Sequence, residues 1–311
     1  MRTKYLLLFL TIFLLLSSVR VVIAENRTLE ENGLAITPFL FEEQTEPGKA
    51  LERTITIANT TNTALPLDIS INDFEPVGKN GQVRFLNPDI NANPGVSLAS
   101  WIKITKQPAY TIEPNSSTTL TFTITPPVGL DAGTHYGGLL FSYHTLPESG
   151  SNTTIVKKIA ALIIVQVGTA KPAANISNFA LDKKYYQNPE IHITTNIVNK
   201  GNTYLQPKGK VEIRNLFGQI AGLAYINENA QTILPQNTRE FTSQFKDPWL
   251  LGYYTANATI WYGSNPKLES HAKASFWVFP IRNMAIILSF LLLAYLLLKA
   301  YNHWIIKHSK G

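Results

Sequence analysis

Apolar and polar residues alternate with a period of two through most of this 311-residue chain. Alternation of this kind gathers the apolar side chains on one face of a β-strand, whereas a helix would need a period near 3.6. The runs are short, rich in Thr, Ile and Val, and separated by Pro, Gly and Asn, which favour turns. They include residues 53–59, 66–73, 117–125, 191–199, 209–215 and 255–262. The pattern predicts an all-β protein made of β-sandwiches, with no helix before residue 281.

Two parts of the chain resemble each other. Residues 112–127 (IEPNSSTTLTFTITPP) and 233–248 (ILPQNTREFTSQFKDP) share an Ile-x-Pro start, an alternating middle and a final proline. Residues 54–69 and 194–213 form a second pair, in which a strand ends on Asn and a short turn leads to a partner strand. The repeat predicts two tandem immunoglobulin-like β-sandwich domains. Their expected bounds are 33–170 and 172–279.

The stretch AGTHYGGLLFSYH, residues 132–144, combines three glycines with two histidines. A phosphate-binding loop would need a helix after its glycines, and no helical pattern follows. We expect a buried strand instead, in which Gly137 and Gly138 lie at a bulge or where a neighbour comes close. His135 and His144 would lie on opposite faces, so they would not bind one metal ion together. The residues expected to face inward, in the two copies, are Leu139, Phe141, Tyr143, Ala258, Ile260 and Tyr262.

The two ends of the chain carry long apolar runs. Residues 1–24 have the pattern of a secretory signal peptide: basic residues, then an apolar run, then a segment that ends on Ala. Arg20, between the apolar run and the cleavage site, leaves an uncleaved anchor as an alternative. The apolar run from Met284 to Lys299 shows no polar face and predicts one transmembrane helix, over residues 281–300, rather than a buried core helix. The basic tail, residues 301–311, is expected in the cytoplasm by the positive-inside rule. The bulk of the chain would then face the cell exterior or the cell wall.

The net charge of +6 comes from these ends. Seven of the 27 Lys and Arg residues lie in the two terminal segments, which leaves 20 against all 21 acidic residues in the part between them. A near-neutral exported part argues against nucleic acid as a partner. The chain has no cysteine, so thiol catalysis, disulfides and cysteine-ligated zinc are excluded.

No pattern of catalytic or ligand residues stands out. The chain lacks a Gly-x-Ser-x-Gly elbow, a His-x-x-x-His helix and a calcium-loop spacing of carboxylates. Glu42, Glu43 and Glu46 are expected to form a solvated acidic turn. We therefore predict no catalytic residues, no metal and no cofactor, and a protein that is not an enzyme.

The residues resemble one known family. An immunoglobulin-like first domain with AGTHYGGLLFS, a second with NIVNKGNTYLQPKGKVEIRNLFGQIAG and a single C-terminal span with a basic tail are similar to the WxL-interacting proteins of Gram-positive bacterial surfaces. The resemblance implies a first domain that binds peptidoglycan and a second that binds a host or surface ligand. It also implies a membrane helix that tethers both beside a surface protein carrying the WxL sequence. It covers nearly the whole exported part and carries over no individual site residue.

Two functions remain open at this level. The first is a non-enzymatic, membrane-anchored surface scaffold that binds cell wall or protein partners, as in adhesion. The second is a chaperone-like or accessory subunit of an export or pilus assembly system, in which an open sheet edge accepts a partner strand. For the first, aromatic residues near the turns are the candidate binding residues, because they offer large contact areas. They are Trp101, Trp249 and Tyr253, and the alternative for the tryptophans is that they plug the ends of their own sandwiches.

Overall fold

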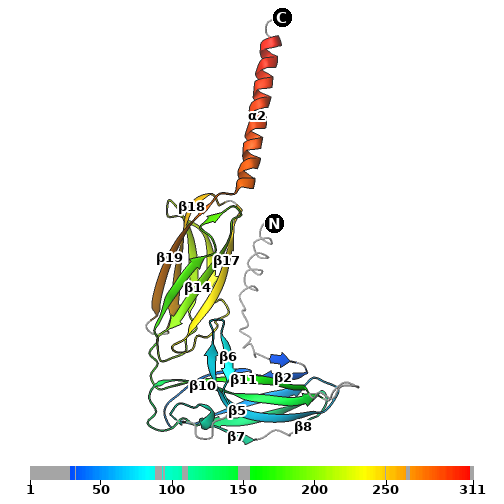
Figure 1. Ribbon diagram of the computed structural model, residues 1–311, viewed down its shortest axis with the longest axis vertical. Helices are drawn as coiled ribbons and strands as arrows, with labels where there is room; N and C mark the ends of the chain where they lie inside the picture. Colours follow the sequence, from blue (N-terminus) through cyan, green and yellow to red (C-terminus); the bar gives the residue numbers. More distant parts are fainter. Residues whose placement is uncertain are drawn as a thin grey trace, which may run out of the picture.

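The computed structural model describes residues 29–31, 33–87, 93, 95–106, 111–145, 155–248, 250–263 and 267–308. It contains two immunoglobulin-like β-sandwiches in tandem and a long helix that projects from the second, so the predicted fold class is confirmed (Figure 1). The strands of the first sandwich run across the direction of those in the second (Figure 1). The predicted signal peptide lies outside the described residues.

The first sandwich has two sheets, with strand orders β1-β2-β4-β9-β7 and β3-β11-β10-β5-β6, and β8 also pairs with β5. The strands are β1 (Leu29–Glu31), β2 (Leu34–Thr37), β3 (Leu40–Thr45), β4 (Leu51–Asn59), β5 (Leu65–Val77), β6 (Gln82–Phe85), β7 (Ile102–Lys106), β8 (Thr111–Ile112), β9 (Ser117–Ile124), β10 (Gly133–Thr145) and β11 (Ile155–Val167). One turn of 3-10 helix, η1 (Ala99–Trp101), precedes β7. This turn corrects the expectation that no helix occurs before residue 281.

The second sandwich also has two sheets, β12-β14-β17 and β13-β19-β18-β15-β16. The strands are β12 (Ala174–Leu181), β13 (Tyr185–Tyr186), β14 (Glu190–Asn199), β15 (Lys208–Asn215), β16 (Ile220–Ile226), β17 (Thr238–Lys246), β18 (Gly252–Tyr262) and β19 (Leu268–Val278). The helix α2 (Ile281–His308) follows after two residues. Its first 22 residues are long and apolar enough to cross a membrane, and none of that span is buried against the sandwiches.

Each sandwich has its own apolar core. Leu139 and Phe141 are fully buried and Tyr143 nearly so, which confirms that this face of β10 points inward. Ala258 and Ile260 are equally buried in β18, and the partly exposed Tyr262 packs against the edge of the same core. The predicted alternation therefore places the cores of both sandwiches correctly.

The paired glycines of β10 lie where other groups come close. A Cβ on Gly138 would stand 2.5 Å from the carbonyl oxygen of Ala161 and 3.0 Å from the Phe85 ring. A Cβ on Gly137 would stand 3.0 Å from the carbonyl oxygen of Asn72. Side chains at these positions would force β10 away from its neighbours, which confirms the expected close approach.

In both sandwiches, the strand that ends on Asn contacts the start of the Ile-x-Pro segment through the same hydrogen bonds. Asn59 ends β4, and its Nδ2 donates to the carbonyl oxygens of Thr63 and Ile112 at 2.7 and 2.9 Å. Asn199 ends β14, and its Nδ2 donates to those of Thr203 and Ile233 at 2.7 and 3.0 Å. Ile112 and Ile233 are the first residues of the Ile-x-Pro repeats. In both sandwiches, the asparagine at the end of a strand thus links its own turn to the start of the Ile-x-Pro segment through two amide hydrogen bonds. We call this arrangement the asparagine clamp.

The two sandwiches are joined by contacts on the outer face of the sheet that contains β11. Ile164 from β11, Phe74 from β5 and Leu234 from the second sandwich form one buried cluster. Beside it, the Glu42 carboxylate accepts hydrogen bonds from Gln206 Nε2 at 2.8 and 2.7 Å and from Thr232 Oγ1 at 2.5 Å. Glu42 therefore lies in strand β3 and links the sandwiches, so the expected solvated acidic turn is wrong at this residue.

Candidate partner-binding edge and cleft

Strand β11 has one edge that is only half covered. Its 13 residues all pair with β10 on one side. On the other side β3 pairs with six of them, Leu162–Val167, which leaves the seven residues 155–161 without a strand neighbour among the described residues. We call residues 155–161 the free edge. It exposes backbone groups that can hydrogen-bond to another extended chain.

The backbone groups that point outward on the free edge can be identified from the covered half. The Leu162 N–H donates to the Phe39 carbonyl at 2.8 Å, and the Gly168 N–H donates to the Thr45 carbonyl at 2.9 Å. Successive peptide groups of a strand point to opposite edges, so residues two apart share an edge. The N–H and C=O groups of Val156, Lys158 and Ala160 therefore face outward on the free edge.

The chain leaves this edge free because β2 and β3 belong to different sheets. β2 pairs with β4 in the first sheet, and the chain then crosses at Thr37, Pro38 and Phe39 to the second sheet, where β3 runs parallel to β11. The Thr37–Pro38 peptide is cis. Since β3 begins only at Leu40, it reaches the second half of β11 and no further.

The side chains along the free edge change character from one end to the other. Ile159 and Ala161 are buried in the core of the first sandwich, whereas Val156 is 48% exposed and is followed by Lys157 and Lys158. Lysines on an edge strand discourage pairing with a second copy of the same basic edge. The free edge would best match a partner strand with apolar residues near Ile159 and acidic residues near the two lysines.

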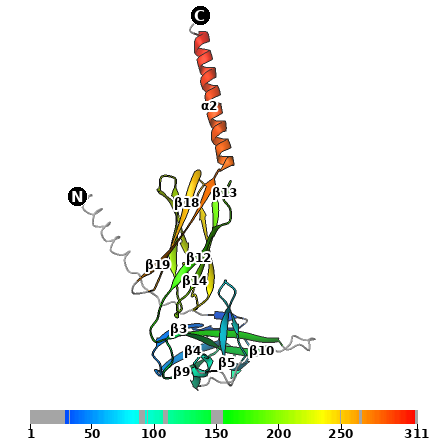
Figure 2. The same cartoon turned by 60° about the vertical axis from the view of Figure 1, so that its left-hand side comes forward.

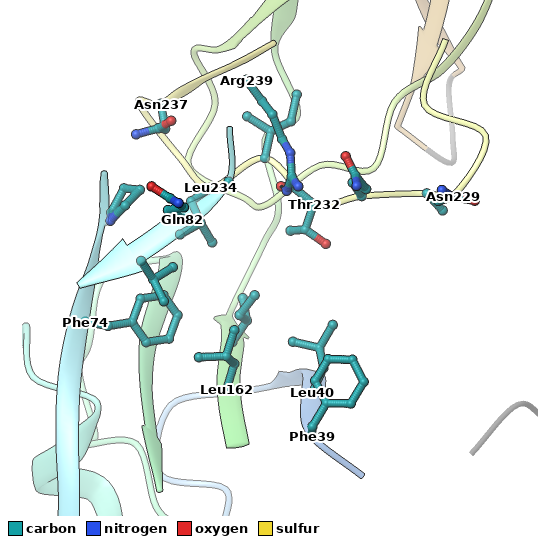
Figure 3. Close-up of a pocket in the computed structure, with 17 residues that line it drawn as sticks. Phe39, Leu40, Phe74, Gln82, Leu162, Asn229, Thr232, Leu234, Asn237 and Arg239 are labelled. Atoms are coloured by element: carbon teal, nitrogen blue, oxygen red, sulfur yellow. Dashed lines mark hydrogen bonds between the residues drawn. The ribbon is translucent and has the colours of Figure 1, made fainter. Parts of the chain in front are cut away.

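The free edge ends beside a cleft between the two sandwiches. The cleft has a volume of about 340 Å³. Figure 3 shows Phe39, Leu40, Phe74 and Leu162 lining it from the first sandwich and Asn229, Thr232, Leu234 and Arg239 from the second. Leu162 directly follows the free edge, and its N–H is bonded to the Phe39 carbonyl. Because both residues line the cleft, a strand added to the free edge would have one end at this cleft.

Arg239 supplies the positive charge of the cleft. Its Nη1 donates to the Thr232 carbonyl at 2.7 Å, and its guanidinium covers Gly81 so closely that a Cβ there would clash with it. Burial lowers the pKa of Arg239, and its Nε has no hydrogen-bond partner among the described residues. The guanidinium N–H groups can donate to an anionic or carbonyl oxygen of a molecule in the cleft.

The three residues predicted to bind a ligand are not gathered in one place. Trp101 is only 3% exposed and packs in the core of the first sandwich, with its ring centroid 4.5 Å from that of His135. A ligand could reach Trp101 only after the loop around it moved, so a binding role for it stays a prediction. Tyr253 lies at the helix-proximal end of the second sandwich, 5.2 Å from Trp277. Trp249 lies outside the described residues.

His135 contacts the segment that leads to Trp101. Its Nδ1 lies 3.1 Å from the Val96 carbonyl, and burial lowers the pKa of its imidazole, although Val96 and Asp73 partly oppose the shift. The charged form is thus disfavoured in the folded protein.

We expect acid to destabilise the first sandwich through His135. In the pH range between the folded pKa and the unfolded value of about 6.5, the unfolded chain binds a proton that the folded chain does not, so stability falls as the pH falls. His135→Phe keeps a ring against Trp101 but cannot titrate. Thermal unfolding measured from neutral to mildly acidic pH should therefore show a larger fall in melting temperature for wild type than for this variant. Parallel curves would contradict the lowered pKa.

No group of three or more His, Cys, Asp and Glu side chains with metal-binding geometry occurs within the described ranges. The features that can act on another molecule there are an unpaired strand edge, a cleft with one arginine and exposed aromatic side chains. These are features of binding surfaces.

Known proteins resemble this chain weakly in structure and not in sequence. No protein-family model and no curated protein matches it. Similar solved structures include the class 5 fimbriae chaperone CfaA, 14% identical over 78% of this chain and 98% of that chain, with a TM-score of 0.38. A chain of the CFA/I chaperone–tip adhesin complex is 13% identical over 76% and 97%, with a TM-score of 0.41. The Pseudomonas aeruginosa CupB2 chaperone is 12% identical over 76% and 96%, with a TM-score of 0.33.

Values this low describe a likeness of overall architecture and carry no information on partner or ligand. The chain is thus a protein of two tandem immunoglobulin-like sandwiches followed by an apolar helix.

Proposed function

We propose that this protein is a non-enzymatic, membrane-anchored binding module that holds a partner protein by accepting one of its extended segments along the free edge. The observation that carries the proposal is the seven-residue stretch of β11 that pairs with β10 on one side and with no described strand on the other. Strand addition uses backbone hydrogen bonds for affinity and alternate side chains for specificity. It corresponds to the chaperone-like or accessory role among the two open functions.

The apolar helix α2 would anchor the module. Its 22-residue apolar span is about 33 Å long at 1.5 Å per residue, which matches a hydrocarbon core of roughly 30 Å. Lys299 lies near the C-terminal end of this span and Lys307 and Lys310 follow it, whereas Arg282 is the one basic residue at its start. This asymmetry supports a cytoplasmic tail and sandwiches on the outer side.

The geometry also limits the segment that would bind. It would be extended over about seven residues, with apolar side chains every second residue and acidic groups near Lys157 and Lys158. Its end at the cleft would lie within reach of the Arg239 guanidinium. The resemblance to WxL-interacting proteins supports a surface protein with the WxL sequence as the partner, and peptidoglycan as a further ligand of the first sandwich.

A single proline tests the proposal. Lys158→Pro removes an N–H that points outward on the free edge and leaves the hydrogen bonds to β10 in place, as edge-strand prolines do. A photo-crosslinking residue at Val156, which is 48% exposed, reports the partner in cells that make the full chain. We expect Lys158→Pro to reduce the crosslinked product about tenfold or more, because one lost hydrogen bond and the added ring together exceed about 1.4 kcal/mol.

Lys158→Ala is the matched control, because it removes the charge and keeps the N–H. If the alanine variant lost the product to the same extent as the proline variant, the partner would be held by charge and strand addition would be wrong. Thermal unfolding of both variants checks that β11 remains folded.

A further inference from the structure

Exposed apolar side chains gather at the end of the second sandwich from which α2 emerges. Leu216 and Phe217 form the β15–β16 turn and are 72% and 85% exposed. Leu251 precedes β18, and Trp277 and Phe279 lie at the end of β19. We define the juxtamembrane collar as Leu216, Phe217, Leu251, Tyr253, Trp277 and Phe279.

The collar residues form one surface although they come from three separate parts of the chain. Leu216, Phe217, Leu251, Tyr253 and Trp277 line one shallow hollow. The rings of Tyr253 and Trp277 meet edge to face at 5.2 Å, and Trp277 stacks on Phe279 at 5.6 Å. Both views show this end of the second sandwich directly below the start of α2 (Figures 1 and 2).

The turn that carries Leu216 and Phe217 is held in place by its own hydrogen bonds. Asn215 Oδ1 accepts from the N–H groups of Phe217 and Gln219, both at 3.0 Å. Gly218 adopts a φ of +79°, which allows the chain to reverse there. The turn therefore presents two large apolar side chains to the outside instead of folding them onto the sandwich.

The short connection to α2 fixes how far the collar lies from the membrane. Only Phe279 and Pro280 separate β19 from α2, a reach of at most about 7 Å. Asn283 Nδ2 also donates to the Pro248 carbonyl at 2.9 Å, which ties the first turn of α2 to the loop before Leu251. The polar interface of a bilayer is roughly 5–8 Å thick on each side. If α2 spans the bilayer from Ile281, Phe279 lies at this interface, and the shared hollow places the other collar residues beside Trp277 at the same end of the sandwich.

We propose that the juxtamembrane collar docks on the outer surface of the bilayer that α2 crosses, with Leu216 and Phe217 inserted among the lipids. Aromatic rings with a polar edge, such as Trp277 and Tyr253, are favoured at this depth. Docking holds the second sandwich on the membrane at two places, α2 and the collar. The proposal rests on the membrane anchor of the proposed function and is independent of the strand partner.

The absence of native cysteine makes a direct test possible. The full chain with Phe217→Cys, labelled with the fluorophore NBD, is reconstituted in nanodiscs of equal parts phosphatidylcholine and phosphatidylglycerol. Val128→Cys is the matched control, because Val128 is 84% exposed and belongs to the first sandwich. We expect doxyl-labelled lipid to quench the probe at position 217 and aqueous iodide to quench the probe at position 128. Leu251→Cys is a second collar variant in case the label disturbs the turn.

The outcomes separate the two proposals. If the chain enters nanodiscs but iodide quenches both collar probes as strongly as the control, the collar proposal is wrong and the surface is open to a protein partner instead. If the chain does not enter nanodiscs, the membrane anchor is wrong and the collar proposal fails with it. Crosslinking from Val156 in cells tests strand addition at the free edge separately from the nanodisc experiment.

Discussion

Truncation of Phe141 to alanine is expected to lower the free energy of unfolding of the first sandwich by about 3–5 kcal/mol. Phe141 is fully buried in the middle of β10, where it lies opposite Ile159 of β11 on one side and Ile69 of β5 on the other. Its removal leaves a cavity between strands that cannot close because both neighbours are held by backbone ladders. Chemical denaturation followed by circular dichroism measures the loss.

Leu140→Ala is the matched control for this experiment. Leu140 is the next residue along β10, so its side chain points to the opposite face, where it is partly exposed. Leu140→Ala should lower the free energy of unfolding clearly less than Phe141→Ala does. Equal unfolding midpoints for Phe141→Ala and wild type would show that this face of β10 is not the core.

Asn199→Asp should be nearly as damaging to the second sandwich. Asn199 is fully buried, and its Nδ2 satisfies the Thr203 and Ile233 carbonyls while its Oδ1 accepts from the Gly201 N–H at 2.9 Å. Aspartate would direct a charged oxygen at two carbonyl oxygens, and unpaired buried charges cost about 3–5 kcal/mol. Acid should restore part of the loss, because a protonated carboxyl regains one donor.

The exposed Asn178→Asp is the control for Asn199→Asp, since it introduces the same charge on the surface of the same sandwich. Differential scanning calorimetry of the two variants should show a large shift for the buried position only. Similar midpoints for both would mean that the buried amide is not a clamp, and that the likeness between Asn199 and Asn59 is one of sequence alone.

Local patterns were sufficient to predict the strands and the cores. Alternation depends only on neighbouring residues, so the inward positions of Leu139, Phe141 and Ile260 could be predicted without knowledge of the fold. The close approach at Gly138 could be inferred for the same reason, because a glycine weakens an apolar strand unless a neighbouring group needs the space of its missing side chain.

Features that depend on distant segments could not be predicted. The free edge exists because β3 pairs in parallel with only part of β11, more than 100 residues later in the chain. The continuous apolar run of residues 159–167 is typical of a strand buried on both faces, but the cover on the outer face of β11 comes from Leu234 in the other sandwich. Glu42 resembled a solvated residue because its partners, Gln206 and Thr232, are also in that sandwich.

The candidate binding residues show the same limit. An aromatic residue near a turn can either plug a sandwich or face outward, and the sequence does not distinguish these positions. Trp101, the last residue of η1, packs inward, while Tyr253 lies in the collar. Leu216 and Phe217 are the most exposed apolar side chains of the collar, and their position directly after β15 gave no sign that they would share a hollow with Leu251 and Trp277.

If α2 anchors the protein in a membrane, the second sandwich sets the height of the free edge above that membrane. β19 has 11 residues and runs from the first sandwich towards α2, a rise of about 36 Å. The free edge would therefore stand roughly this far above the bilayer, with the second sandwich as a pedestal. A partner held in the same membrane would have to span this height, which takes at least about ten residues if the linking segment is fully extended. Secreted or wall-bound proteins would meet no such restriction.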